Sequence, residues 1–236
     1  MSHHIVRASL TMLAITLAAA NAVGAQVGHT PQESPYVDLV YRHEITTFSG
    51  YLDTRRDPAG VAPRSAPIAG VRYSLYLAGP ASLTARLAYG RTNRTVLDPI
   101  EPADSRVAIP DASVSLLVAD VGMALSLTGF KSWNRLVPEL SGGLGFISDF
   151  RTEADVGGFD FGTRFALTLG AGVRYVPGGR FQLRADVTDN LYRIAYPNTY
   201  YGAVTGVTPI VDNEQPKSFW THNPSITLGV SYLFGR

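Results

Sequence analysis

The chain of 236 residues has no cysteine and almost no lysine. Without cysteine it can form neither a disulfide framework nor a thiolate metal site, and it has no cysteine to carry a lipid anchor. Lys131 and Lys217 are its only lysines, so nearly every cation is an arginine, the side chain better suited to buried or bidentate pairing. With 20 basic residues against 19 acidic ones, no basic surface for nucleic acid is predicted.

The sequence also lacks an apolar run long enough to cross a bilayer as a helix. The apolar stretch 8–20 falls well short of the ~20 residues required, and no other window approaches its length without a charge, glycine or proline. It follows His3, His4 and Arg7 and precedes small residues at 22–25. We therefore predict a cleaved secretory signal over residues 1–25, a periplasmic tail over 26–35 and one domain over 36–236.

What the chain has in quantity is turn formers and aromatic residues, with 23 Gly, 15 Pro, 12 Tyr and 10 Phe. Between the turns, large apolar residues alternate with Gly, Ser, Thr, Arg and Asp, the period of a strand with two unlike faces. The alternation predicts eight strands, at 36–46, 68–78, 82–92, 113–128, 135–148, 164–175, 181–193 and 225–235. The side chains of the polar face are mostly too small and too polar to form the core of a soluble protein, so we interpret the apolar face as lipid-facing.

The predicted connections alternate in length. Those at 79–80, 129–134 and 177–179 are short, whereas those at 47–67, 93–112, 149–160 and 194–218 are long and polar. An even number of strands of about ten residues with this asymmetry is typical of a transmembrane β-barrel, whose closure leaves no open edge in the bilayer. The predicted fold is all-β: a single antiparallel up-and-down transmembrane barrel of eight strands, with short periplasmic turns and long extracellular loops.

This architecture and the closing strand resemble the small eight-stranded outer-membrane barrels, the OmpA-type transmembrane domains and their OmpX-like and OmpW-like relatives. The resemblance covers residues 36–234. It implies a monomer in the bacterial outer membrane, and it implies that the barrel-assembly machinery reads an aromatic-ended closing strand, here Ile226, Leu228, Val230, Tyr232 and Phe234. Gly235 and Arg236 follow Phe234, whereas the family typically ends on the aromatic residue.

The polar face carries a candidate network of six cations and five anions that would line the lumen: Asp38, Arg42, Glu44, Arg72, Arg86, Asp120, Glu139, Arg164, Arg174, Arg184 and Asp186. An eight-stranded barrel has room for side chains and little else. One interpretation is a packed network in which buried charges satisfy each other. The other is a narrow, porin-like polar path for ions or small solutes, and the residues alone do not separate the two.

Catalysis is not predicted, and neither is a cofactor or a metal. An outer-membrane lipid acyl hydrolase would need a base and a nucleophile, for which the chain offers His43 and His222 with Glu44 and either Ser49 or Ser218. We expect the two histidines near the loop-side ends of the first and last strands, which become neighbours when the barrel closes. No His-x-Ser or Gly-x-Ser-x-Gly spacing supports that arrangement, and no metal-ligand spacing is present. A different class of protein, a soluble exported lipocalin-like barrel binding a small apolar ligand, would point the apolar faces inward.

The long loops are the places where we expect partners. The first loop carries Arg55, Arg56 and Arg64, which we expect to meet lipopolysaccharide phosphates, and the last carries Tyr196, Tyr200 and Tyr201. We interpret the tyrosines as a cap over the barrel mouth, although such loops also bind proteins or sugars. The predicted partners are outer-membrane lipid, lipopolysaccharide and the assembly machinery, for a protein with a structural or surface role or a very narrow pore.

Overall fold

The computed structural model describes residues 34–77, 79–99, 109–151, 153–202 and 209–235, so the predicted signal and most of the predicted tail lie outside the described residues. The strands are β1 Tyr36–Asp38, β2 His43–Leu52, β3 Ala66–Tyr76, β4 Ala81–Val96, β5 Ile109–Ser126, β6 Lys131–Trp133, β7 Leu136–Ser148, β8 Thr163–Gly178, β9 Phe181–Ala195 and β10 Ser218–Phe234, with one short 3-10 turn, η1 Asn198–Tyr200. No described helix is long and apolar enough to span a bilayer.

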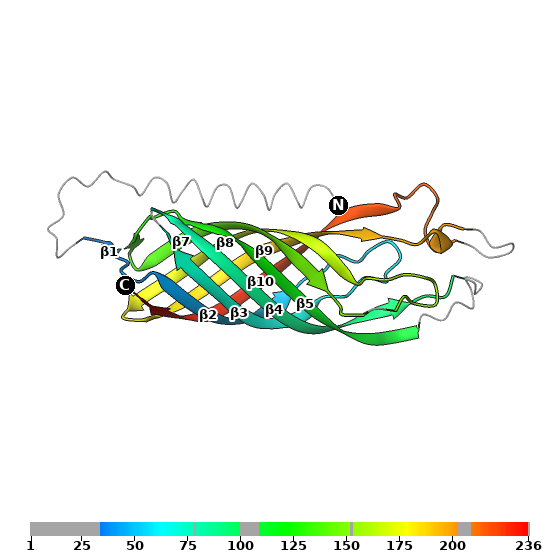
Figure 1. The fold of residues 1–236 in the computed structure, drawn as a ribbon, viewed down its shortest axis with the longest axis horizontal. Coiled ribbons are helices and arrows are strands. Elements are labelled where there is room, and N and C mark those ends of the chain that lie inside the picture. The colour runs from blue at the N-terminus through cyan, green and yellow to red at the C-terminus, as the bar shows by residue number, and fades with distance from the viewer. Residues whose placement is uncertain (1–33, 78, 100–108, 152, 203–208, 236) are drawn as a thin grey trace, which may run out of the picture. The chain divides into compact units, whose positions relative to one another are not determined.

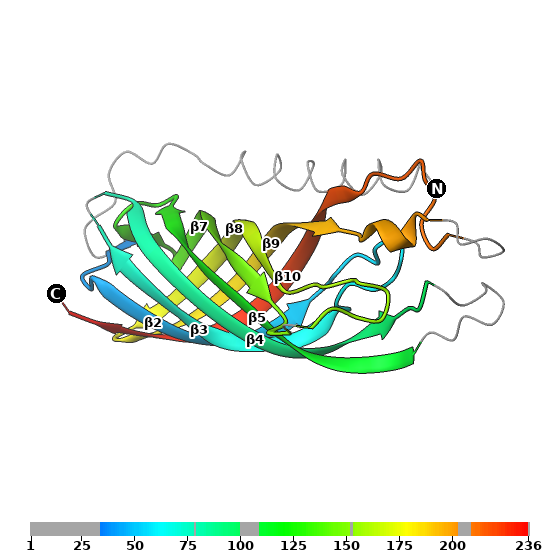
Figure 2. The same ribbon diagram turned by 45° about the vertical axis from the view of Figure 1, so that its right-hand side comes forward.

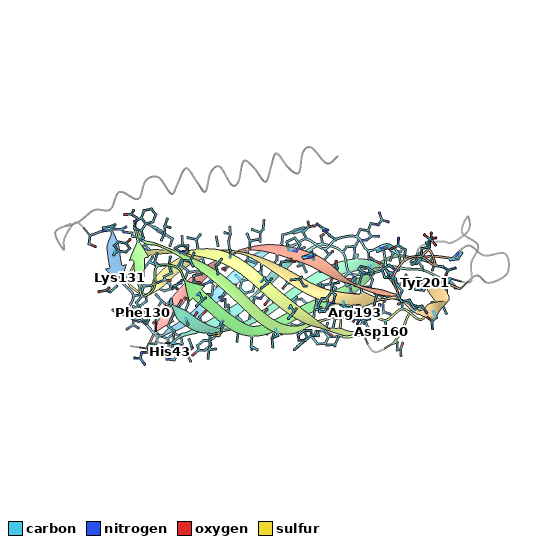
Figure 3. The ribbon with its side chains drawn as sticks, turned by 90° about the horizontal axis from the view of Figure 1, so that it is seen from above. His43, Phe130, Lys131, Asp160, Arg193 and Tyr201 are labelled. Carbon is cyan, nitrogen blue, oxygen red and sulfur yellow. The ribbon has the colours of Figure 1, made fainter. Side chains whose placement is uncertain are left out.

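Eight of these strands form a closed antiparallel barrel (Figures 1 and 2). Its order is β2-β3-β4-β5-β7-β8-β9-β10, and β10 pairs with β2 from Ser225 opposite Leu52 to Phe234 opposite His43. The short connections meet at one end, here called the turn end, and the long connections meet at the other, the loop end (Figure 1). His43, Phe130 and Lys131 lie at the turn end, and Asp160, Arg193 and Tyr201 lie at the loop end (Figure 3). The predicted fold class is confirmed.

The polarity of the two barrel faces changes along the strands. In the turn-end part of β5, Val121, Met123 and Leu125 point outward, while Ala124 and Ser126 are buried inside. Toward the loop end the inward positions become apolar, and Leu116 and Val118 are 1% and 3% exposed. β4 shows the same change toward the loop end, where its outward residues are Arg91 and Asn93 in place of Leu87 and Tyr89. At the turn end, the outer face of the barrel is therefore apolar. At the loop end, the interior is apolar, like the core of a soluble protein.

That core joins the loop-end half of the barrel to the long loops. Its buried members are Leu52, Val61, Ala62, Ile68, Ala88, Leu116, Val118, Ile147, Phe159, Phe161, Ala166, Tyr192, Ile194, Tyr196, Tyr200, Tyr201 and Val211. We call this cluster the loop-end plug. Tyr196, Tyr200 and Tyr201 pack within it, as the cap interpretation of the last loop requires, and Phe161 meets Tyr192 edge-on with ring centroids 5.7 Å apart.

The predicted extent of the first strand and the predicted bounds of the long loops are wrong. The first predicted strand, 36–46, is two elements, since β1 pairs with β6 through Tyr36 opposite Trp133 and Asp38 opposite Lys131, while the barrel strand begins only at His43. Three of the four long loops are shorter than predicted, since they span 53–65, 97–108 and 196–217, whereas the third spans 149–162 instead of 149–160. The first error arises because local alternation continues through residues 36–46. The second arises because alternation weakens at the loop end, where both faces are partly buried.

Candidate functional site

The turn-end half of the lumen is crossed by two carboxylates and two guanidinium groups, which we call the lumen quartet. Glu44 of β2 and Glu139 of β7 alternate with Arg174 of β8 and Arg184 of β9. Arg174 lies 2.8 Å from Glu139 (Nε to Oε1) and 3.4 Å from Glu44. Arg184 lies 2.7 Å from Glu139 (Nη2 to Oε2) and 3.5 Å from Glu44. Each cation thus bridges both anions, and no side chain of the four is more than 3% exposed.

Hydroxyl groups add hydrogen bonds to the quartet, while Arg174 Nε and Arg184 Nη1 make ion pairs but no hydrogen bond of good geometry among the described residues. Thr46 and Ser231 donate to Oε1 of Glu44 at 3.0 and 2.8 Å, and the Tyr76 hydroxyl donates to Oε2. The Arg174 guanidinium lies over the Tyr76 ring, 4.9 Å from its centroid. Because buried charges are stable only when paired and hydrogen-bonded, this arrangement serves as a packed interior. Its neutral hydroxyl partners carry no sequence signal of their own, and the prediction missed them.

A second polar layer lies toward the loop end. Arg86 donates from Nε to Asp120 and from Nη2 to Asn190, each at 2.7 Å. Arg184 bonds Asp186 at 2.7 Å, and Arg72 lies 3.8 Å from the same carboxylate. This layer contains a polar void of about 20 Å³, lined by Arg72, Arg86 and Asp120 among others, which is room for about one water molecule.

The loop-end plug covers these two layers. Phe159, Tyr196 and Tyr200 stack with ring centroids 5.9 to 6.2 Å apart. The Tyr196 hydroxyl donates to buried Asp57 at 2.6 Å. Burial and that carboxylate raise the pKa of Tyr196 well above its usual value, and burial does the same for Tyr200. Within the described residues, the lumen is therefore filled by ion pairs in one half and by apolar side chains in the other.

The turn end instead carries an open vestibule of about 910 Å³. Leu39, Val40 and Arg42 line it from the segment between β1 and β2, and Arg174 and Gln182 line it from the barrel. That segment is held at both ends, since Leu39 N donates to Phe130 O at 2.8 Å and Arg42 N donates to Gly235 O at 3.0 Å. The vestibule ends at the lumen quartet.

The structure brings together eight of the eleven predicted lumen residues: Glu44, Arg72, Arg86, Asp120, Glu139, Arg174, Arg184 and Asp186. The other three are corrections. Asp38 lies in β1 and makes an exposed 3.8 Å pair with Lys131, and Arg42 is exposed before β2 begins. Arg164 faces inward at the loop end, where it donates to the Phe161 and Asp160 carbonyls instead of a lumen acid.

The hydrolase constellation is not assembled. His43 lies opposite Phe234 at the turn end and contacts the Tyr73 hydroxyl at 2.7 Å. His222 lies opposite Leu191 at the loop end and contacts Asp189 at 2.6 Å. The expectation that the two histidines become neighbours is wrong, because the antiparallel register of β10 and β2 places them at opposite ends of the barrel. Among the described side chains, no three or more His, Cys, Asp or Glu residues lie close enough together to hold a metal ion.

The closing-strand residues Ile226, Leu228, Val230, Tyr232 and Phe234 all project outward from β10, with exposed fractions between 36% and 65%. Tyr232 packs against Phe181 and Phe234, with ring centroids 5.4 and 6.3 Å apart. Around the barrel, Leu83, Leu140, Leu169 and Leu183 continue the same exposed apolar band. A band of this kind on all sides of a barrel matches the surface that hydrocarbon requires.

Comparison with known proteins found similarity of structure only. No family model matches the chain, and no curated protein does. Three similar solved structures are the outer membrane protein OprG of Pseudomonas aeruginosa (12% identity, 84% of this chain and 99% of that one, TM-score 0.48), Neisserial surface protein A (13%, 81% and 97%, 0.46) and the Yersinia pestis outer membrane protein Ail (15%, 81% and 99%, 0.39). At such identities the likeness concerns the fold alone.

Proposed function

We propose that this chain is an exported bacterial outer-membrane protein with a structural or surface role and no open channel. The turn end faces the periplasm, and the loop end faces the exterior. The single observation that carries this proposal is the division of the barrel into an apolar-outside half, filled by the lumen quartet, and a loop-end half filled by apolar side chains. We propose that it acts as a monomer, since closure removes the sheet edges through which barrels would pair.

The polar lumen argues against a lipocalin-like ligand-binding barrel. Such a protein needs an empty apolar interior, whereas the apolar part of this interior is occupied by its own Phe159, Phe161 and Tyr192. The packed quartet likewise disfavours a narrow pore, because an ion would have to displace paired charges that the barrel wall leaves no room to move. Catalysis has no support in the separated histidines.

The first test is fractionation of a Gram-negative host that expresses the chain with its predicted signal. We expect the protein in the outer membrane, with gel migration that shifts on boiling. Recovery as a soluble periplasmic protein would overturn the proposal. The second test is conductance in planar bilayers, where we expect no steady current from the purified protein. Stable unitary currents would replace the structural role with the narrow pore.

The closing strand provides a test of assembly. We propose that the outward row from Ile226 to Phe234 is read by the barrel-assembly machinery during insertion. Phe234→Ala should lower the outer-membrane level of the protein in cells while leaving refolding into detergent intact. Equal loss in both experiments would show that Phe234 serves barrel stability instead.

A further inference from the structure

The loop between β2 and β3 is held in shape around a single buried carboxylate. Asp57 is 6% exposed and accepts hydrogen bonds from the backbone N–H groups of Val61 and Ala62 at 3.2 and 3.0 Å. The Tyr196 hydroxyl, which belongs to the loop-end plug, donates to the same carboxylate at 2.6 Å. The loop is therefore a fixed part of the loop-end half of the barrel.

Its two ends are fastened to each other and to β4. Thr54 N donates to the Ser65 hydroxyl and Thr54 Oγ1 donates to the Pro63 carbonyl, both at 2.9 Å. Arg64 N donates to the Asn93 carbonyl at 3.0 Å, and its guanidinium donates to Thr95 at 2.7 Å. Between these attachments lies a hollow of about 420 Å³, whose polar lining consists of Arg55, Arg56 and Arg64 with Asp57, Thr54 and Ser65.

Three arginines and one carboxylate, Asp57, line the hollow, and two of the arginines are exposed. Arg55 and Arg56 are exposed, and among the described residues no carboxylate lies within ion-pair distance of either one. Asp57 lines the hollow, but its carboxylate accepts hydrogen bonds from Val61 N, Ala62 N and the Tyr196 hydroxyl. Asp53 accepts a hydrogen bond from the Ser65 hydroxyl at 2.8 Å. Two guanidinium groups are thus left facing solvent on a rigid frame.

A third exposed arginine, Arg91, lies on the outer face of β4, nearer to the apolar band. Its Nε donates to the Tyr89 hydroxyl at 3.4 Å, and Tyr89 belongs to the aromatic residues that border the band. In the register between β4 and β5, Tyr89 lies opposite Leu117 and Arg91 lies opposite Ser115. Arg91 is therefore two residues nearer to the loop end than Tyr89. On the proposed orientation, Arg91 lies at the outer membrane surface and the hollow lies above it on the same side of the barrel.

We infer that this sector binds phosphate groups of the outer-leaflet glycolipid, lipopolysaccharide, with Arg55 and Arg56 as the principal donors and Arg91 as a contact at the membrane surface. Guanidinium groups bind phosphate oxygens in a two-pronged geometry, and basic side chains beside an anionic leaflet strengthen membrane attachment. The membrane glycolipid is favoured over a soluble anion because Arg91, on the same side of the barrel, contacts the outward Tyr89 next to the apolar band. The inference rests on the proposed orientation in the outer membrane.

The β9–β10 sector provides a matched control. There Asp189 and His222 pair with each other, Arg193 donates to Ser218, and Lys217 donates to Asn198 at 2.9 Å. Replacing Arg193 and Lys217 with alanine removes two exposed cations from the loop end without touching the hollow. A difference between this variant and Arg55→Ala/Arg56→Ala would therefore report on position and not on net charge.

The experiment uses the full chain refolded into phosphatidylcholine vesicles and measures binding of purified lipopolysaccharide, of dephosphorylated lipopolysaccharide and of inorganic phosphate. We expect Arg55→Ala/Arg56→Ala to weaken lipopolysaccharide binding about tenfold and Arg193→Ala/Lys217→Ala to change it less than twofold. Arg55→Lys/Arg56→Lys should recover part of the binding, since lysine keeps the charge but loses the planar fork. Heat-modifiable migration of every variant checks that the barrel is intact.

Three results would overturn the inference: unchanged binding by Arg55→Ala/Arg56→Ala, equal binding of dephosphorylated lipopolysaccharide, or equal loss in the control variant. Inorganic phosphate that binds as tightly as lipopolysaccharide would reject the membrane source and assign the hollow to a soluble anion. Fractionation tests the proposed function separately, so an outer-membrane protein that ignores lipopolysaccharide would refute this inference alone.

Discussion

Arg94 and Asp155 form a two-pronged ion pair inside the loop-end plug, with Nη1–Oδ2 and Nη2–Oδ1 distances of 2.6 Å each. Both side chains are 1% exposed. The Arg94 guanidinium also lies 5.6 Å from the centroid of the Phe159 ring. The pair joins β4 to the loop before β8, and it places two opposite charges in the most apolar part of the molecule.

Breaking this pair from one side should loosen the plug. Arg94→Met leaves Asp155 buried without its main partner, and we expect a loss of about 3–5 kcal/mol in unfolding free energy. The measurement is denaturant unfolding in detergent, followed by near-ultraviolet circular dichroism of the packed tyrosines. The double variant Arg94→Met/Asp155→Leu removes both charges and should recover most of the loss. If the double variant is as unstable as the single one, the pair is not the cause.

The lumen quartet should behave as a coupled unit. In a double-mutant cycle of Glu139→Gln and Arg184→Gln, we expect a coupling free energy of about 0.5–3 kcal/mol, because the two groups lie 2.7 Å apart and away from solvent. Asp38→Asn and Lys131→Gln give the control cycle. That pair is 3.8 Å apart, with side chains 75% and 57% exposed, and should couple by less than about 1 kcal/mol. Equal couplings would contradict the buried-network interpretation.

Gly145 should be essential for pairing between β5 and β7. A Cβ atom there would lie 1.9 Å from the Ala119 carbonyl oxygen and 2.6 Å from Asp120 Cα, and backbone atoms cannot move aside without breaking the ladder. We expect Gly145→Ala to reduce the heat-modifiable fraction after refolding. Gly142→Ala in the same strand is the control, since its Cβ would meet nothing closer than 3.6 Å. Similar refolding of both variants would refute the close-approach argument.

Asp149 should make the loop end more stable in acid. Burial raises the pKa of this carboxyl, whose surroundings include Arg94, Arg151 and Asp160, and its Oδ2 has no hydrogen-bond partner in the described part of the chain. The folded state therefore holds the proton more tightly than the unfolded state. Its stabilising contribution is complete below the unfolded pKa of about 4 and is lost as pH rises through the raised folded value.

Thermal unfolding midpoints of the loop-end signal, measured between about pH 4 and 7, check this prediction. The midpoint of the wild-type protein should fall across that range more steeply than the midpoint of Asp149→Asn, which cannot ionise. Exposed Asp212 supplies the control, and Asp212→Asn should keep the wild-type profile. An Asp149→Asn profile identical to the wild-type one would show that another group carries the pH dependence.

Local sequence pattern is enough to predict the fold class and the inward or outward orientation of most side chains. Alternation at a period of two assigns each residue to a face without knowledge of its partners, so Val121, Val173 and Val230 were placed outward from local pattern alone. The difference in length between short and long connections then predicts which connections lie at each end of the barrel. These features depend on residues that are close together in the sequence, so a single sequence is enough to predict them.

The ends of the strands and the partners of the buried charges depend on the tertiary structure. Asp38 and Glu44 stand in one continuous alternating stretch, yet only Glu44 reaches the lumen, because pairing with β10 and β3 begins at His43. Arg94 and Asp155 are 61 residues apart, and neither belongs to a recognisable pattern. The register around the closed barrel fixes such pairs, as it does the separation of His43 from His222, and register is a property of all eight strands together.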